Sequence, residues 1–506
     1  MRPCAKTLVL LVLLVGARSW VAADVKLPRV FSDNMVVQQK MKIPVWGWAA
    51  PGEQVTVTLG ASKGTDTAAA DGKWLVRLDP LAAGGPFDLT VAGKNTLTVK
   101  NVLVGEVYIA SGQSNMEFTE RGAKNAAQEA AAANYPLIRM FTVTKNIASG
   151  PQSDCEGSWQ VCTPATVPGF SAVGYFFAVN LQKALNVPVG IIHTSWGGTP
   201  IQSWTDLQSL EDEPALKTMG DQTAAYFAAY SKQLAAIMHE WLPTYEGAVA
   251  AGKTPPAAPP LYNVGGPGAG SPTGLYNAMI APLVPYGIAG ALWYQGESDA
   301  GNPMLYRTQL PTMIKGWRRL WGEGDFGFFI VQLANYTPQV PQPTADGGWA
   351  AQRESQALAL ALPKTGMACI IDIGDGGNIH PTDKQDVGLR LALAAEKVQY
   401  GMDVVYSGPT YAAMKVEGNK VRISFDNLGG GLVVKGGGPL QGFAIAGADK
   451  KLVWADATID GDTVLVSSAQ VPQPTIVRYA FESNPVCNLY NKADLPAVPF
   501  RTDAPK

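Results

Sequence analysis

Four apolar segments of this chain each run directly into a turn that carries glycine and polar residues. The turns have the sequences SGQSN, TSWGG, YQGES and DIGDGGNIH. Short apolar runs of this kind are typical of buried strands in a parallel sheet, whose carboxyl ends all lie at one edge. Open α/β sheets place their functional sites at that edge. We therefore predict that the four turns meet there.

The order of the expected elements favours an α/β fold. From residue 101 onward, apolar strands alternate with helical segments, which predicts a parallel sheet with helices on both faces. The expected helices cover 124–133, 172–185, 304–321, 350–360 and 383–400, and the expected strands include 107–110, 189–192, 288–293 and 368–372.

Both ends of the chain have a different pattern. Short alternating strands separated by Gly-containing turns predict a β-sandwich over residues 24–100, and short strands return in a C-terminal β region over 403–506. The α/β region then covers 101–402. It contains an insertion at about 206–272, in which a helical stretch precedes a Pro/Gly-rich segment. We expect that segment to be a flexible loop or lid near the site.

Residues 1–23 have the pattern of a secretory signal peptide. A basic start, an apolar core at 8–17 and small residues before the junction predict cleavage after Ala23. The apolar run is too short for a membrane span, and no later segment is long and apolar enough for one. We therefore expect a soluble exported protein, either secreted or periplasmic.

Composition excludes several classes of partner. The formal net charge is −2, charged residues make up 16% of the chain, and no basic run occurs. Neither nucleic acid nor an anionic membrane is therefore an expected partner. No His/Cys cluster has metal-ligand spacing, so we expect no metal and no other cofactor. The oligomeric state is not predicted.

Four cysteines follow the signal peptide. Cys155 and Cys162 flank a short loop, so in an oxidising compartment they are the expected disulfide. Cys369 is expected to be a buried thiol, and spacing leaves the state of Cys487 open. None of the four lies at a turn like that of Ser114, so a thiol nucleophile is not favoured.

Ser114 is the candidate nucleophile, because the turn after the strand 107–110 can present its hydroxyl at the strand's end. A serine hydroxyl reacts poorly at neutral pH without a base, a group that orients the base, and donors for an oxyanion. The chain has three histidines. His380 lies on a Gly-rich loop between a strand and a helix and is the candidate base, whereas His193 and His239 are expected to be structural or surface residues.

Two other turns supply candidate oxyanion donors and a carboxylate. Gly197 and Gly198 allow backbone N–H groups to approach a ligand closely. Gln295 and Glu297 bring an amide donor and an acid to another strand end.

The blocks GQSNM, SWGGT, WYQGES and NIHPTDKQDVGLRLA resemble those of the sialate O-acetylesterase family and related carbohydrate acetylesterases, within the SGNH hydrolase fold. Further segments such as VFSDNMVVQQ and NPVCNLYNKADLPAVPFRTD extend the resemblance over nearly the whole mature chain. The resemblance implies a carbohydrate O-acetylesterase that acts on acetylated sugars or glycans through a serine acyl-enzyme.

The resemblance also implies roles for individual residues. Ser114 is the nucleophile and His380 the base, and the oxyanion is held by the Ser114 N–H, a glycine of Gly197-Gly198 and the Gln295 side chain. The residues assigned to substrate are Gln113, Asn115, Trp196, Tyr276 and Asn277. Aromatic faces such as those of Trp196, Trp204, Tyr276 and Tyr306 can stack on sugar rings, although any one of them can equally pack in the core.

The chain departs from the SGNH pattern at the acidic member of the triad. Many members have aspartate three residues before the histidine, where this chain has Gly377. Glu297 is the favoured substitute, because a carboxylate in that turn can orient the imidazole. The alternatives are Asp375 or Asp372, or a backbone carbonyl near Gly377, which would leave a serine–histidine dyad.

Three functions stay open on the sequence alone. The family's name points to acetylated sialic acid. The low charge fits acetylated hemicelluloses such as xylan or xyloglucan equally well, because no convergent arginine for a carboxylated sugar stands out in the blocks. A non-catalytic carbohydrate-binding protein with a degenerate hydrolase core is the third possibility.

Overall fold

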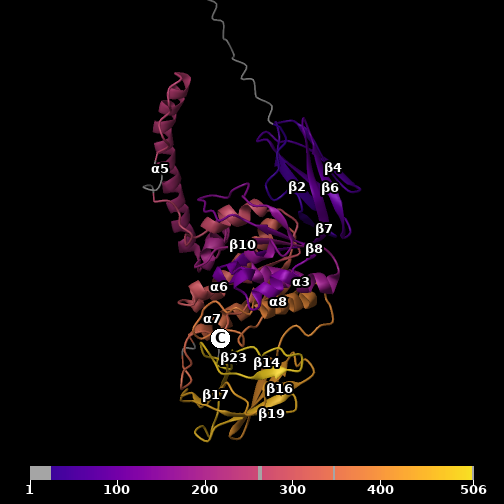
Figure 1. Ribbon diagram of the computed structural model, residues 1–506. Helices are drawn as coiled ribbons and strands as arrows, with labels where there is room; N and C mark the ends of the chain where they lie inside the picture. The colour runs from indigo at the N-terminus through magenta and orange to yellow at the C-terminus, as the bar shows by residue number, and fades with distance from the viewer. Residues whose placement is uncertain (1–23, 260–264, 346–347, 504–506) are drawn as a thin grey trace, which may run out of the picture.

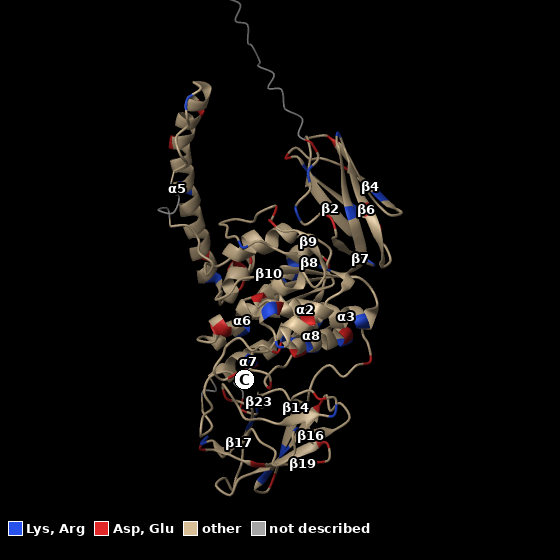
Figure 2. Cartoon of the chain, in the orientation of Figure 1, with Lys and Arg blue, Asp and Glu red and all other residues tan. Residues whose placement is uncertain are grey.

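The computed structural model describes residues 24–259, 265–345 and 348–503. The predicted signal peptide lies outside these residues, as does the stretch 260–264 of the predicted Pro/Gly loop. An α/β region occupies the middle of the molecule, with the N-terminal and C-terminal β regions at opposite ends (Figure 1). Acidic and basic residues are interspersed through all three regions (Figure 2). None of the described helices combines the length and the apolar character that crossing a membrane requires.

The central sheet confirms the expected α/β class with a mostly parallel sheet. Its strand order is β13-β12-β11-β7-β10-β8-β9, and neighbouring strands run parallel except β9, which is antiparallel to β8. The strands are β7 (Thr96–Gly112), β8 (Tyr135–Thr142), β9 (Trp159–Cys162), β10 (Val189–Ser195), β11 (Gly290–Tyr294), β12 (Gly327–Val331) and β13 (Thr365–Ala368).

Helices cover both faces of this sheet. Successive side chains of β7 point to opposite faces, so Val107 and Ile109 join one buried cluster while Tyr108 and Ala110 join another. Strands buried on both faces are apolar along most of their length, which explains the apolar runs in the sequence. The helices of the region are α1 (Ser114–Glu117), α2 (Ala126–Ala132), α3 (Ala172–Leu185), α6 (Pro303–Trp321), α7 (Trp349–Ala357) and α8 (Lys384–Val398).

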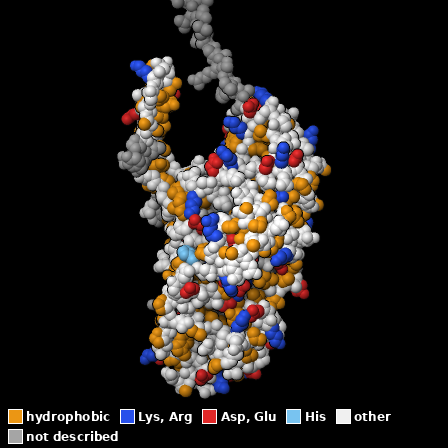
Figure 3. All heavy atoms as spheres, in the orientation of Figure 1, with side chains coloured by type: hydrophobic (Ala, Val, Ile, Leu, Met, Phe, Trp, Pro, Cys, Tyr) orange, Lys and Arg blue, Asp and Glu red, His pale blue; other side chains and the backbone are white. Residues whose placement is uncertain are grey.

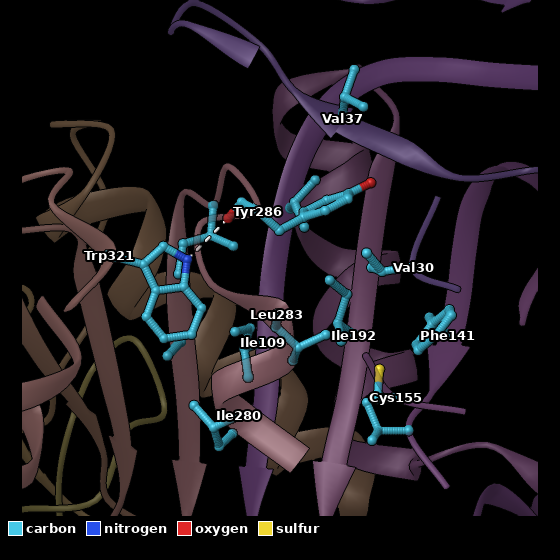
Figure 4. Close-up of a cluster of buried hydrophobic side chains, with 14 of the residues drawn as sticks. Val30, Val37, Ile109, Phe141, Cys155, Ile192, Ile280, Leu283, Tyr286 and Trp321 are labelled. Carbon is cyan, nitrogen blue, oxygen red and sulfur yellow. Dashed lines mark hydrogen bonds between the residues drawn. The ribbon is translucent and has the colours of Figure 1, made fainter. Parts of the chain in front are cut away.

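Figure 4 shows part of the first cluster, where Ile109 and Ile192 from neighbouring strands face Ile280 and Leu283. The indole N–H of Trp321 donates to the Tyr286 carbonyl at 2.9 Å, so this polar group is satisfied inside the apolar cluster (Figure 4).

One long strand joins the N-terminal β region to the central sheet. The first part of β7 pairs with β6, and its last part pairs with β10 and β11. The predicted boundary at residue 100 falls inside this strand. The remaining strands of the region are β1 (Val36–Gln38), β2 (Ile43–Trp48), β3 (Gln54–Leu59), β4 (Ser62–Thr67), β5 (Lys73–Leu78) and β6 (Gly84–Ala92).

The C-terminal β region packs on the segment after β13. The strand expected over 368–372 ends at Ala368, because Cys369 and Ile371 leave the sheet and join the buried cluster of the C-terminal region. That region consists of β14 (Thr410–Glu417), β15 (Lys420–Asp426), β16 (Leu432–Val434), β17 (Phe443–Ala446), β18 (Val453–Trp454), β19 (Asp456–Asp460), β20 (Thr463–Ser467), β21 (Ile476–Tyr479), β22 (Leu489–Asn491) and β23 (Phe500–Arg501).

The predicted insertion contains α4 (Leu207–Asp212) and α5 (Lys217–Ala250). Helix α5 projects away from the rest of the molecule (Figure 1). Hydrophobic side chains are visible along it (Figure 3), and those with large exposed fractions are Tyr226, Leu242, Tyr245 and Val249.

The predicted disulfide between Cys155 and Cys162 is wrong. Both are free, buried thiols. Cys155 packs in the first cluster, whereas Cys162, in β9, packs in the second, so the two side chains lie in different cores. Burial raises the pKa of each thiol to about 12, which makes the thiolate scarce at neutral pH.

Candidate active site

Three of the turns begin side by side. Gly112 at the end of β7 is in register with Ser195 of β10 and Tyr294 of β11. Ser114 follows two residues later, as the first residue of α1. Its side chain is only partly buried, and its backbone N–H has no acceptor among the described residues. The hydroxyl is thus held at the carboxyl edge of the sheet.

The fourth turn brings His380 to Ser114. The ring Nε2 of His380 lies 2.8 Å from the Ser114 Oγ, although the two residues are 266 positions apart. The backbone N–H of His380 donates to the Asn378 Oδ1 at 2.9 Å, which shapes the loop. Burial lowers the pKa of His380 and the positive charge of Lys384 lowers it further. The imidazole is therefore held in its neutral, proton-accepting form.

The structure places none of the three candidate carboxylates against the imidazole. Neither oxygen of Glu297 hydrogen-bonds the His380 ring: Oε1 accepts from the Asn115 Nδ2 at 2.6 Å, and Oε2 has no partner among the described residues, so the predicted pairing is wrong. Asp375 accepts from the Gly377 N–H at 2.8 Å and is not the orienting acid either. Asp372 instead binds Arg390 through both oxygens, at 2.6 and 2.8 Å. Within the described residues, the arrangement is a serine–histidine dyad.

Asn115 connects three of the turns instead of facing substrate. Its Nδ2 donates to Glu297 and, at 3.0 Å, to the carbonyl of Ile379, the residue before His380. Its Oδ1 accepts from the Lys384 Nζ at 2.6 Å. Only 1% of Asn115 is exposed, so its predicted substrate contact is wrong.

Lys384 is a residue that the sequence reasoning missed. It is buried at the start of α8, where burial lowers its pKa to about 7 against the opposing effects of Glu297 and Asp383. Burial also raises the pKa of Glu297, and the Asn115 hydrogen bond opposes this rise. A sequence signal existed: a lysine in the first turn of a helix opposes the helix dipole, so it needs another reason to be there.

The SWGG turn lies against Ser114. A Cβ on Gly197 would come within 3.2 Å of the Ser114 Cβ. The Gly197 N–H donates to the Glu117 Oε2 at 2.7 Å and so is not available to an oxyanion. Gly198 is exposed, has a φ of 74°, and its N–H has no acceptor among the described residues. Of the two glycines, Gly198 is the free donor.

Gln295 is not the predicted oxyanion donor. It is fully buried, and its Nε2 donates to the Thr199 carbonyl at 3.2 Å and to the Asp299 Oδ2. Its Oε1 accepts from the Tyr306 hydroxyl at 3.0 Å. Both amide hydrogens are therefore engaged, and the side chain ties the YQGES turn to the SWGGT turn.

Gln113 has a similar structural role. Its Oε1 accepts from the backbone N–H of Gly296 at 3.4 Å and from that of Ser298 at 3.2 Å. The side chain is 3% exposed. The Oε1 of Gln113 therefore joins the turn of Ser114 to the YQGES turn, and the contact of Gln113 with substrate stays a prediction.

Most of the predicted sugar-contacting aromatic residues are in the core. Tyr276 and its neighbour Asn277 are buried, and the Asn277 Nδ2 donates to the Ala148 carbonyl at 3.1 Å, so both assignments to substrate are wrong. Trp204 and Tyr306 are fully buried as well.

Two partly exposed aromatic rings remain near the dyad. Trp196 precedes the glycines of its turn, and its backbone N–H donates to the Gly112 carbonyl at 3.1 Å. Phe118, which the sequence reasoning did not single out, has its ring centroid 6.4 Å from that of His380. Its only sequence signal was its place four residues after Ser114.

Comparison with known proteins identifies relatives that cover most of the chain. A family model described as "Carbohydrate esterase, sialic acid-specific acetylesterase" matches residues 104–239 and 267–399, which include all four turns. The sialate O-acetylesterase of Rattus norvegicus is 32% identical over 75% of this chain and 74% of its own length. That of Homo sapiens is 30% identical over 93% of this chain and 91% of its own.

A solved structure is also similar over nearly the whole chain. The crystal structure of a carbohydrate acetylesterase from Xanthomonas citri superposes with a TM-score of 0.81 and is 40% identical. The alignment covers 95% of this chain and 100% of the other.

Proposed function

This chain belongs to the sialic acid-specific acetylesterase family of carbohydrate esterases, and from that premise we propose that it hydrolyses O-acetyl groups on sugars through a serine acyl-enzyme. The α/β region would then be an SGNH-type hydrolase domain. The observation that carries the mechanism is the 2.8 Å contact between the Ser114 Oγ and the His380 Nε2. This distance is within the range for proton transfer from a nucleophile to its general base.

In the first half-reaction, the Ser114 Oγ attacks the acetyl carbonyl carbon while the His380 Nε2 accepts the hydroxyl proton. The N–H groups of Ser114 and Gly198 stabilise the oxyanion that forms. As the tetrahedral intermediate collapses, the bond to the sugar oxygen breaks and the imidazolium returns the proton to that oxygen. The deacetylated sugar leaves, and Ser114 carries the acetyl group.

In the second half-reaction, water takes the place of the sugar hydroxyl. His380 accepts a proton from the water as it attacks the acetyl carbonyl, and the proton then passes to the Ser114 Oγ when acetate leaves. Because no carboxylate of the described residues hydrogen-bonds the ring, the position of the imidazole depends on the loop held by Asn115.

A direct test is covalent labelling. A fluorophosphonate, which reacts with activated serines, is expected to add one phosphonyl group to Ser114, located by mass spectrometry of the peptide. Label at another residue, or none with a protein that hydrolyses p-nitrophenyl acetate, would contradict the proposed nucleophile.

The substrate class follows less directly. The relatives' names favour acetylated sialic acid. One observation favours neutral glycans as a second candidate: Lys145, the cation 5.2 Å from the Trp196 ring centroid, is already paired with Glu117 at 2.6 Å. Acetate release from O-acetylated sialic acid and from acetylated xylo-oligosaccharides, measured side by side, separates the two.

We also propose that the protein is exported and that its signal peptide ends at Ala23. Mass spectrometry of the protein recovered from its native compartment is expected to give an N-terminus at Asp24. An intact N-terminal segment on the exported protein would contradict this proposal.

The pH dependence of kcat/KM is expected to reflect the neutral form of His380. Burial and the Lys384 charge both disfavour the imidazolium, so the pKa is lowered and the base stays unprotonated to lower pH. Activity should therefore fall only as the pH drops below the ordinary histidine value of about 6.5. A profile of kcat/KM from pH 4 to 8 checks this, and an acid limb centred above 6.5 would contradict it.

Glu297→Gln is expected to lower kcat/KM by about 10- to 100-fold. The reason is that Glu297 supports Asn115 and does not touch the imidazole. Loss of the orienting acid of a true triad costs about 10⁴-fold. Steady-state kinetics on p-nitrophenyl acetate distinguish these two losses in kcat/KM. A loss of about 10⁴-fold in a folded variant would show that Glu297 is the orienting acid after all.

A further inference from the structure

Lys384 is assigned no proton transfer in the mechanism above, although it is buried beside the dyad. We propose that Lys384 is a positioning residue of the esterase: through Asn115 it holds the His380 loop against Ser114 and places a positive charge near the imidazole. This inference rests on the proposed function. It assigns to Lys384 and Asn115 the positioning of the imidazole, which an orienting acid performs in a catalytic triad.

The ammonium group of Lys384 is held on several sides. Its Nζ donates to the Asn115 Oδ1 at 2.6 Å. The same Nζ lies 5.0 Å from the ring centroid of Phe118 and 5.1 Å from that of Tyr294. Aromatic faces attract cations most strongly where water is excluded, and Lys384 has no exposed surface. Below neutral pH, where this amine with its lowered pKa of about 7 is protonated, the positive charge is therefore fixed in one place.

The two charges flanking Asn115 determine which way its amide points. The carbonyl Oδ1 faces the cation of Lys384, and the Nδ2 faces the carboxylate of Glu297 at 2.6 Å. Reversing the amide would set its N–H groups against an ammonium and its oxygen against a carboxylate, which is unfavourable at both ends. Between Lys384 and Glu297, the Asn115 amide therefore has one favourable orientation.

In that orientation, the Asn115 Nδ2 faces the loop that carries His380. The Nδ2 also donates to the Ile379 carbonyl at 3.0 Å, and Ile379 is bonded directly to His380. Asn115 is itself bonded to Ser114. A single buried side chain therefore connects the backbone next to the nucleophile with the backbone next to the base.

The charged groups around the lysine support this arrangement. Glu297 and Asp383 both favour the charged form of Lys384, against the effect of burial. Asp383 is partly neutralised by Lys124 at 2.9 Å. Lys384 is in turn the charged group that lowers the pKa of His380, in addition to burial. An esterase base without a carboxylate partner remains unprotonated more readily beside such a cation.

The test is Lys384→Met, which keeps an unbranched side chain one atom shorter and removes the charge. We expect kcat for p-nitrophenyl acetate to fall by about 10- to 100-fold, with a smaller change in KM, because the loop loses its anchor. We also expect the acid limb of kcat/KM to move upward by on the order of half a pH unit, because the cation that lowers the His380 pKa is gone.

Two variants serve as controls. Lys397→Met removes a partly exposed lysine near the other end of α8 and should change neither kcat nor the pH of the acid limb of kcat/KM. Lys384→Arg keeps the positive charge. The midpoint of its acid limb of kcat/KM should stay at the wild-type pH even if kcat falls. If Lys384 were purely structural, Lys384→Met would lower kcat equally at all pH values and leave the acid limb of kcat/KM where it is in the wild type. That result would overturn the proposal.

Lys384→Met leaves the buried carboxylate of Glu297 without its counter-charge, which can destabilise the fold. The double variant Lys384→Met/Glu297→Gln removes both charges. The acid limb of its kcat/KM profile should shift to higher pH by the same amount as in Lys384→Met. An unmoved limb in the folded double variant would also overturn the proposal. Failure of the proposed function looks different, because the wild type would then lack esterase activity that depends on Ser114.

Discussion

Ser114→Ala is expected to lower kcat for acetate ester hydrolysis by about 10⁴-fold or more. The substitution removes the Ser114 Oγ, which lies 2.8 Å from the His380 Nε2, and so leaves no hydroxyl at this position to carry the acetyl group. Removal of the hydroxyl should leave the fold intact, because Ser114 is only partly buried and this oxygen makes no other hydrogen bond among the described residues. Initial rates with p-nitrophenyl acetate, together with circular dichroism, measure both effects.

His380→Ala is the companion variant. If the serine and histidine act as a unit, the Ser114→Ala/His380→Ala double variant should be no slower than either single one. Ser153→Ala, on an exposed loop, is the matched control and should keep wild-type kcat. Ester hydrolysis that survives in a folded Ser114→Ala protein would mean that the reaction uses another nucleophile.

Gly112→Ala is expected to destabilise the protein by about 3 kcal/mol and to lower kcat at least about 100-fold. Gly112 has a φ of 138°, which residues with a Cβ rarely adopt. A Cβ there would lie 2.1 Å from the Tyr294 carbonyl oxygen, so β7 and β11 would have to separate. Ser114 follows two residues later and would move with the displaced strand end.

Urea unfolding and steady-state kinetics measure the two effects of Gly112→Ala. Gly301→Ala is the control, since a Cβ at Gly301 meets nothing within 4 Å and its φ does not require glycine. A Gly112→Ala protein with wild-type stability and activity would show that the close approach of β7 to β11 is not needed to place the nucleophile.

Local patterns were sufficient for the fold class and for the two residues of the dyad. Strands buried on both faces are largely apolar, so the apolar parts of β7, β10 and β11 could be recognised in the sequence. Because parallel strands end at one edge, Ser114 and His380 could be expected to meet although 266 positions separate them. Helix α3 has the predicted bounds, since Ser171 caps it at its start.

Local patterns failed where a polar side chain in a turn had two possible partners. Gln295 and Glu297 lie at a strand end and have the chemistry of a donor and an acid, yet each binds another protein group. Cys155 and Cys162 are close in sequence but enter different cores. In each case the spacing was compatible with the predicted role, and the packing decided otherwise.

The amino-acid sequence by itself determined that this chain forms a mostly parallel sheet with Ser114 and His380 at its carboxyl edge, because strand burial and strand direction are set by repeating local patterns. Only the tertiary structure decided that Asn115, Glu297 and Lys384 form a buried bridge beside them. The physical reason is that hydrogen-bond partners and burial depend on segments 182 and 269 positions away, whose distance in space no local pattern contains.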